Sequence, residues 1–422
     1  MSDTLAVEEE TTTRITGADI RKRRQTLGLT LETLSSGICS TAYLSLIEQG
    51  HRQASPRIAD LLIARLRAKA GESGVAMQIA SLRVAEWQIR QSSGLEPELR
   101  NSPALRGHQF LLDALESEAR DEPGTALAQL DTWQAEHEGS RDLKSFGGRI
   151  RVRLLRELGR ESEALTFASE LLVSAQQQIK SRQDDLLDIA FQTADMYSAA
   201  GLWRDALRVI EKHRTLITDP RQEANARWAA SNAYYIKGDF ERALIEVNAA
   251  LNVIGDLDLP AAEAKLTTNA VWCELHAGIV DRHSQQARLD EAAAVLRGQG
   301  QSMPLAWVNA SFALLHAKLG DSAAFKRSAE DAIAVSINTN SREHDELIVA
   351  LAGIAVAHEE KSFAKQLLER FDARTREIQH SRAEALVLYR AGKVAEALGD
   401  FKRAFAYLDS SHTQLGFVAS QH

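Results

Sequence analysis

Short polar side chains gather on one predicted helix near the beginning of this sequence. In the segment GLTLETLSSGICSTAYLSLIEQG, residues 28–50, Leu44 and Ile47 lie three residues apart and predict the buried face of a helix. The opposite face then presents Thr41, Ala42, Ser45 and Gln49. Hydroxyl and amide groups can hydrogen-bond to the edges of DNA bases, and a small methyl group can contact the methyl of thymine. This face is therefore a candidate surface for reading DNA.

The signals around that face predict a helix-turn-helix. A first helix is expected from about Thr16 to Leu27, with Gly28 as its stop. Thr30 and Ser40 are good N-caps for the second and third helices, and Gly37 suits the turn between them because glycine tolerates a positive φ. A fourth helix should begin at Ser55-Pro56 and bury Ile58, Leu61, Leu62 and Leu66.

The charge of the chain is unevenly distributed. Residues 14–69 hold ten Lys or Arg against four Asp or Glu, which gives +6, and the other 40 basic and 54 acidic side chains give −14. A small basic head on an acidic body suits a head that meets phosphates. We expect Arg23, Arg24 and Arg52 to anchor phosphates, with the caps Thr30 and Ser40 beside them. The reading face itself has no arginine, so strong bidentate contacts to guanine are not expected from it.

These residues also have purely structural interpretations. Any four-helix segment with a glycine turn can imitate the pattern, and the block 21–24 is by itself typical of a solvated helix face. Cys39 is expected to be a small buried turn residue, with redox sensing as the alternative.

The segment from Ile15 to about Leu66 resembles the Xre, or lambda-repressor-like, helix-turn-helix family. The resemblance lies in GLT at 28–30 and YLSLIEQG at 43–50, with one residue fewer than usual between Leu34 and Tyr43. LSSGICS at 34–40 resembles the version in the RRNPP regulators of Gram-positive bacteria. Those cytoplasmic receptors join this domain to tetratricopeptide repeats and sense secreted oligopeptides, so the resemblance implies DNA binding and quorum sensing.

A loose repeat follows in the rest of the chain. The pattern G-x-aromatic-x-x-A is clearest in GLWRDAL at 201–207, GDFERAL at 238–244 and GDFKRAF at 399–405, and its glycines fall at 159, 201, 238, 278, 320 and 399. With weaker pairs near 105–137 and 342–372, about eight helical pairs are expected. The pattern resembles tetratricopeptide repeats over about 300 residues and predicts a superhelix with a concave groove. An unrelated helical bundle is the alternative.

The inner helix of each pair should line that groove. Asparagine and glutamine amides there could clamp an extended peptide backbone, and Arg149 or Arg153 could meet its carboxylate terminus. In RRNPP receptors asparagines on this surface hold the peptide, and the resemblance implies the same here. Acidic members favour a ligand with some positive charge, although each of these side chains could simply be solvated. Arg390 and Lys393 are interpreted as a solvated face or a dimer contact. The expected ligand-binding set is Arg149, Arg153, Asp188, Gln192, Asp195, Asn225, Asn232 and Asn269.

Motifs for other chemistry are missing. No GxxxxGK[ST], HExxH, GxSxG or paired CxxC occurs, so we expect no enzyme, metal or cofactor. His276 and His283 are interpreted as surface residues. The two cysteines exclude a disulfide framework, and no signal peptide or membrane span is recognised, which favours the cytoplasm.

The sequence therefore predicts an all-α protein, with a helix-turn-helix domain followed by a tetratricopeptide-like α-solenoid. The expected divisions are a disordered leader at 1–13, a DNA-binding domain at 14–70, a connecting helical segment at 71–104 and a repeat domain at 105–418. The predicted function is a homodimeric transcriptional regulator that binds a DNA operator and senses a short peptide. The alternatives are an adaptor for an intracellular protein and a regulator that senses a metabolite.

Overall fold

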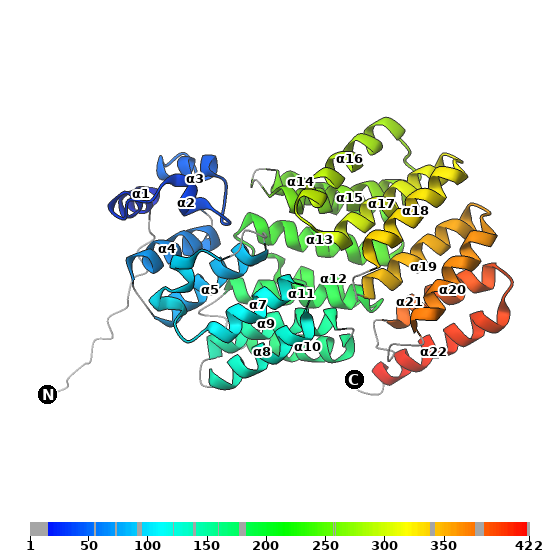
Figure 1. Ribbon diagram of the computed structural model, residues 1–422, viewed down its shortest axis with the longest axis horizontal. Coiled ribbons are helices and arrows are strands. Elements are labelled where there is room, and N and C mark those ends of the chain that lie inside the picture. Colours follow the sequence, from blue (N-terminus) through cyan, green and yellow to red (C-terminus); the bar gives the residue numbers. More distant parts are fainter. Residues whose placement is uncertain are drawn as a thin grey trace.

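A computed structural model describes the chain at residues 16–54, 56–71, 74–90, 95–120, 122–137, 141–158, 160–176, 183–255, 257, 259–337, 342–375 and 384–419 (Figure 1). The expected leader at 1–13 lies outside these residues. The predicted all-α class is confirmed, because the described residues form twenty-two α-helices and one short 3-10 helix without a strand. None of these helices is both long and apolar enough to cross a bilayer.

The first four helices form a small head. The side chains of Thr16, Thr30 and Ser40 each accept a hydrogen bond from a backbone N–H of the helix that follows. Gly28 and Gly37 adopt φ values of 67° and 65°, as their positions between helices require. The bounds are α1 (Gly17–Thr26), α2 (Leu31–Ser35), α3 (Thr41–Glu48) and α4 (Pro56–Ala70).

Close packing of α1 on α3 defines the interior of the head. A Cβ atom on Gly17 would lie 1.8 Å from the carbonyl oxygen of Ile47, so only glycine permits this crossing. Ile20, Leu34 and Leu44 fill the space between the helices and are almost completely buried. The apolar spacing in the sequence therefore leaves the outer face of α3 free of any packing role.

The segment at 71–104 joins the head to the repeats through a continuous core. It contains α5 (Val75–Arg90), α6 (Pro97–Arg100) and the 3-10 helix η1 (Pro103–Leu105), and α5 packs against α4, α7 and α9. A single apolar cluster runs from Leu44 in the head through Leu82 to Leu112 in the first repeat. Head and body are thus packed together.

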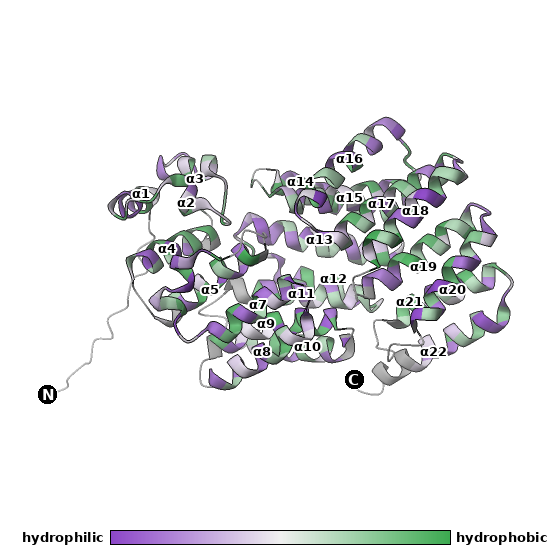
Figure 2. Ribbon diagram, viewed as in Figure 1, coloured by the Kyte–Doolittle hydropathy of each residue, from purple (hydrophilic) through white to green (hydrophobic). Residues whose placement is uncertain are grey.

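Eight helical pairs follow in the described residues, as the repeat pattern predicts. Helices within a pair pack closely, and hydrophilic and hydrophobic residues alternate along most of them (Figure 2), with buried apolar residues of neighbouring helices forming shared clusters. The pairs are α7 (Gln109–Ala119) with α8 (Pro123–Glu136), α9 (Arg141–Glu157) with α10 (Glu161–Gln176), α11 (Gln183–Ala199) with α12 (Trp203–Arg214), α13 (Pro220–Lys237) with α14 (Phe240–Ile254), α15 (Pro260–His276) with α16 (Arg282–Gly298), α17 (Ser302–Lys318) with α18 (Ser322–Ser336), α19 (Arg342–Ala357) with α20 (Lys361–Thr375), and α21 (Glu384–Ala397) with α22 (Phe401–Ala419).

Left-handed residues mark the turn inside most pairs. Positive φ values occur at Gly201, Gly238, Gly278, Gly320 and Gly399, while Gly159 lies outside the described residues. The long interval between Gly320 and Gly399 contains one more such turn, before α20. There Glu359 adopts a φ of 63°, which costs a residue with a Cβ about 1 kcal/mol. The repeat pattern, which was counted from glycines, therefore misses this turn.

The array curls so that distant pairs meet. In Figure 1, α19 to α22 lie beside the middle of the array. The Arg390 guanidinium of α21 lies 6.0 Å from the centre of the Tyr235 ring of α13, and a Cβ on Gly201 would contact Leu386 at 3.6 Å. This curvature encloses the inner side of the array.

Candidate functional site

The outer face of α3 is exposed while the head rests on the body. Thr41, Ala42 and Gln49 are exposed and Ser45 is half-buried. The Gln49 side-chain amide donates to the Ser45 hydroxyl over 3.0 Å. Leu46 is 38% exposed beside them and adds an apolar contact that the sequence interpretation omitted. The four expected side chains thus share one accessible face.

Two of the three expected phosphate anchors are accessible. Arg23 and Arg52 are exposed at the two ends of the motif, and the Arg52 guanidinium lies 5.6 Å from the centre of the Tyr43 ring. Thr30 and Ser40 serve as caps, so their hydroxyls already bind the backbone N–H groups of Thr33 and Tyr43.

The expected role of Arg24 needs correction. Its guanidinium makes two 2.7 Å hydrogen bonds to the Glu48 carboxylate and a third, of 2.9 Å, to the Leu29 carbonyl. The hydrogen bonds to Glu48 raise the pKa of Arg24. Because these bonds occupy a side chain that is only 12% exposed, Arg24 ties α1 to α3 instead of reaching a phosphate.

Two buried arginines hold the turn between α2 and α3. Arg65 of α4 donates to the carbonyls of Thr33 at 3.1 Å and Leu34 at 3.3 Å, and also to that of Ser36. From the body, Arg221 at the start of α13 donates to the carbonyl of Ile38. The orientation of α3 is therefore fixed by both the head and the repeat array.

Cys39 lies in the same turn and is half-buried, as expected for a small turn residue. Burial raises the pKa of its thiol to about 11, more than the nearby Arg221 and Arg65 lower it. The thiol is therefore protonated at neutral pH, which makes it a poor nucleophile.

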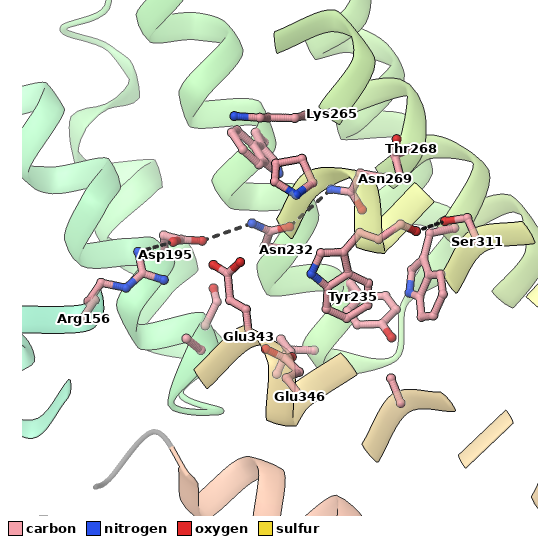
Figure 3. Close-up of a pocket in the computed structure, with 18 of the residues that line it drawn as sticks. Arg156, Asp195, Asn232, Tyr235, Lys265, Thr268, Asn269, Ser311, Glu343 and Glu346 are labelled. Carbon is pink, nitrogen blue, oxygen red and sulfur yellow. Dashed lines mark hydrogen bonds and ion pairs between the residues drawn. The ribbon is translucent and has the colours of Figure 1, made fainter. Parts of the chain in front are cut away.

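The concave side of the array encloses a cavity of about 610 Å³. One wall comes from α9, α11, α13 and α15, and the facing wall from α19 and α21, with α17 closing one end (Figure 3). Such a volume lies in the range of typical small-ligand pockets. Because the two walls belong to repeats far apart in sequence, the cavity exists only through the curl of the array.

A row of linked polar side chains crosses the first wall. Arg156 donates to Asp195 over 2.9 Å, Asn232 donates to the same carboxylate over 3.1 Å, and Asn269 donates to Asn232 over 3.3 Å. Asp195, Asn232 and Asn269 are each 37 residues apart, so the repeat places them at equivalent positions on α11, α13 and α15. Each asparagine side chain has a second amide N–H besides the one in this row, and both side chains lie on the same wall (Figure 3).

Aromatic rings line the cavity next to this row. Trp272 and Trp307 meet edge to face with ring centres 5.5 Å apart, and Trp228 is 36% exposed nearby. Burial raises the pKa of Tyr235, which keeps its phenol neutral. Flat apolar surfaces beside amide donors suit a ligand that is part backbone and part apolar side chain.

Charged residues occupy the facing wall. Glu343 of α19 points toward Asp195 and Asn232 (Figure 3). Arg390 forms a 3.1 Å ion pair with Glu346 and lines the cavity. The interpretation of Arg390 as part of a solvated face is therefore wrong, whereas Lys393 is exposed and pairs with Glu396.

The cavity takes up half of the expected ligand-binding set: Arg153, Asp195, Asn232 and Asn269 line it. Asn225 is exposed on α13 but is not part of the lining. Gln192 donates to the Arg149 carbonyl over 3.3 Å, which places it in the contact between α9 and α11.

The arginines expected to bind a ligand carboxylate are engaged by the protein's own acids. Arg149 pairs with Glu86 and lies 3.8 Å from Asp188. Arg153 donates to Glu118 over 2.7 Å and to Glu86 over 2.9 Å. Burial alone would lower the pKa of Arg153, but Glu118 and Glu86 raise it overall. Arg149, Arg153 and Asp188 therefore form a network that joins α5, α7, α9 and α11.

His276 also differs from its expected surface position. Its ring stacks on Phe240 with centres 5.0 Å apart and contacts Tyr235 and Trp272. Burial lowers its pKa to about 4. His283 is exposed, as expected.

Several cavity residues were missed, and part of the signal was in the sequence. Tyr235 and Trp272 follow Asn232 and Asn269 by three residues each, so they lie on the same face of their helices about one turn further along. Residues on the facing wall carry no such signal, because local patterns do not encode the curl. The missed residues include Arg156, Tyr235, Lys265, Thr268, Trp272, Trp307, Ser311, Glu343, Glu346 and Arg390.

The arrangement offers binding groups and no activated nucleophile among the residues described. Burial raises the pKa of Cys273 to about 12. Within the described ranges no cluster of three His, Cys, Asp or Glu could hold a metal ion. The cavity can donate amide hydrogen bonds, stack on apolar groups and balance charge.

Comparisons with known proteins give a loose structural likeness. No protein-family model matches the chain, and no curated protein matches it either. One similar solved structure is Bacillus thuringiensis PlcR in complex with the peptide PapR7 and DNA, with 18% identity, a TM-score of 0.42, and coverage of 68% of this chain and 95% of that chain. A second is a Rap protein complexed with competence and sporulation factor, with 10% identity, a TM-score of 0.48, and coverage of 96% and 100%. A third is a tetratricopeptide repeat protein from Parabacteroides merdae, with 16% identity, a TM-score of 0.36, and coverage of 71% and 98%. At these values the likeness is one of general helical stacking and assigns no function.

Proposed function

We propose that the protein is a sequence-specific DNA-binding transcriptional regulator whose repeat cavity binds a short peptide. It acts as a homodimer and has no enzymatic activity of its own. The observation that carries the proposal is the joining of an exposed α3 face and a polar, aromatic cavity in one molecule, with α13 contacting both the turn before α3 and the cavity. Arg221 at the start of α13 holds the turn before α3, and Asn232 further along α13 lines the cavity.

The head supplies the chemistry of DNA binding. Thr41, Ala42 and Gln49 are short enough to let α3 approach base edges, while Arg23 and Arg52 can reach phosphates on either side. A single α3 face without arginine makes few strong contacts to bases. Two heads of a dimer, bound to paired half-sites, would supply the remaining sequence specificity.

The cavity supplies the chemistry of peptide binding. Second N–H groups of Asn232 and Asn269 can donate to backbone carbonyls, and the tryptophans can pack against apolar side chains. The lining carries four acids, Glu157, Asp195, Glu343 and Glu346, and four bases, Arg153, Arg156, Lys265 and Arg390, so it suits a ligand with charges of both signs, such as a peptide with free termini. Differential binding of that ligand to two arrangements of the array would alter DNA affinity.

Selection from a random duplex library, followed by gel shifts at two salt concentrations, tests the DNA half. Replacing Thr41 and Ser45 together with alanine should lower the preference for the selected site over random DNA by roughly tenfold. Arg23→Ala should weaken binding to both DNAs alike and reduce the salt dependence, whereas Arg208→Ala, an exposed arginine of α12, should change neither. Failure to select any sequence would favour the adaptor function, and equal losses for the double variant would remove α3 as the reading helix.

Two asparagines on α13 provide a matched pair for the peptide half. Calorimetry with peptides selected from a library should show that Asn232→Ala raises the Kd for the peptide by roughly tenfold, because a hydrogen bond from the asparagine side chain to the peptide is lost. Asn225→Ala, on the same helix outside the cavity, should leave Kd unchanged. Equal effects of the two variants would exclude the cavity as the site.

The cavity volume of about 610 Å³ also fits a metabolite, which is the second candidate. Titration with a metabolite set under the same conditions distinguishes the two. Binding of a metabolite that Asn232→Ala abolishes, without any peptide binding, would replace the peptide in the proposal.

A further inference from the structure

The outer face of the last described helix presents two large apolar rings to solvent. Phe401 and Phe405 of α22 are 71% and 72% exposed, more than any other large apolar side chain whose burial the structure describes. They lie four residues apart and so share one face of the helix. Outer faces of terminal repeats are usually polar, because an apolar one invites association.

The same positions are covered in the repeat formed by α13 and α14. Counting from the turn glycine, Phe401 and Phe405 correspond to Phe240 and Leu244 of α14. Phe240 stacks on His276 of the next pair, and Leu244 packs with the apolar cluster that includes Leu266 of α15. The exposed rings of α22 thus occupy positions that in α14 pack against the next helical pair.

Charges on this face are arranged for pairing with a copy of itself. Lys402 and Asp409 are both exposed and lie seven residues apart, which places them on one side of the helix two turns from each other. A two-fold axis passing between Phe405 and Ala406 would set two copies of α22 antiparallel. Lys402 would then face Asp409 of the partner subunit, and the reverse contact follows from the symmetry.

We propose that this face, formed by Phe401, Lys402, Phe405 and Asp409, is the two-fold interface of a homodimer. The inference locates the dimer contact of the proposed regulator, and so it rests on the proposed function. Its apolar centre and charged border match the usual anatomy of an interface. Because α22 lies at the opposite end of the molecule from α1 to α3 (Figure 1), both α3 faces stay uncovered in the dimer.

Sedimentation equilibrium over a range of concentrations tests the interface in the full chain. Replacing Phe401 and Phe405 together with serine should raise the dimer Kd by roughly a hundredfold, since four aromatic rings lose their contacts. The control replaces Ile245 and Ile279 with serine. These side chains are 65% and 50% exposed on other helical pairs, and their loss should leave Kd unchanged.

Charge exchange gives a signature that general loss of stability cannot produce. Lys402→Glu or Asp409→Lys alone should each raise the dimer Kd by roughly tenfold, because like charges then face each other twice. The two changes combined restore opposite charges across the axis and should return Kd to within about threefold of the original. Circular dichroism checks that each variant is folded.

The outcomes separate the two levels of the proposal. A dimer that persists unchanged in the Phe401 and Phe405 variant overturns the interface and leaves the homodimeric regulator standing. A parent protein that stays monomeric, even with a selected DNA site, overturns the homodimer itself. Failure of the combined charge exchange to restore association overturns the two-fold pairing.

Discussion

Arginines around the α2–α3 turn and arginines inside the repeat array have different partners. In the head, Arg65 donates to backbone carbonyls of the α2–α3 turn. In the body, Arg153 pairs with the carboxylates of Glu118 and Glu86. The body also buries histidines, among them His108 and His344, while the only histidine of residues 14–70 is the exposed His51. The shape of the head therefore depends on backbone geometry, whereas the interior of the body contains histidines that can take up protons.

The comparison has a consequence for function. Backbone carbonyls point at a buried arginine only when the backbone has one particular conformation. The turn that orients α3 therefore has little conformational freedom. Side chains such as Asn232 and Asn269 bond to each other, and they can exchange partners when a ligand arrives. The head is therefore built to hold one shape, and the body to respond.

Breaking the head's arrangement should have the largest effect. Arg65→Leu leaves the buried carbonyls of the turn without a donor and should lower the free energy of unfolding of the head by about 3 kcal/mol. Arg221→Leu removes the donor to the Ile38 carbonyl and should cost less, roughly 2 kcal/mol. Hydrogen exchange of amides 36–43 reports both changes.

Arg21→Leu is the control for that experiment, because Arg21 is exposed on α1. Exchange rates in the turn that respond equally to Arg21→Leu and Arg65→Leu would remove the special role of the buried arginine.

Acid should destabilise the body more than the head. Burial lowers the pKa of His344, which is bonded to Ser336 over 2.7 Å, to about 4. Since the unfolded histidine takes up its proton near pH 6.5, stability falls as the pH drops from 6.5 toward 4, by on the order of 3 kcal/mol for such a group. His108, whose pKa burial also lowers to about 4, adds to the same loss.

Tryptophan fluorescence can follow that loss, because all six tryptophans lie at position 87 or later, outside the head. His344→Gln should flatten the pH dependence of urea unfolding, and the exposed His283→Gln should not. Parallel pH profiles for the two variants would contradict the assignment.

Sequence alone predicted those features that short segments determine. The caps at Thr30 and Ser40, the turn at Gly37 and the pairing of helices all follow from residues within a few positions. Asp195, Asn232 and Asn269 were found because the repeat places them in register.

The features that sequence missed depend on contacts between distant segments. Glu86, which engages Arg149 and Arg153, comes from α5, more than 60 residues earlier. Glu346 and Arg390 reach the cavity only because the array curls back on itself. Arg24 matched the pattern of a phosphate anchor, and nothing near it in sequence indicated Glu48 as its partner.

The smallest predicted effect concerns backbone strain, where head and body differ again. Every described residue with positive φ in the head is a glycine, whereas the body uses Glu359 at the turn before α20. Glu359→Gly should stabilise the protein by on the order of 0.5 kcal/mol, the relief of strain less the extra freedom of glycine in the unfolded chain. Glu359→Ala keeps the Cβ and should give no gain.

Gly399→Ala, at the equivalent turn with no atom within 4 Å of the added Cβ, should cost about 1 kcal/mol through φ alone. Thermal unfolding of the three variants measures these differences, and a gain from Glu359→Ala equal to that from glycine would show that side-chain contacts, and not φ, set the stability of the turn.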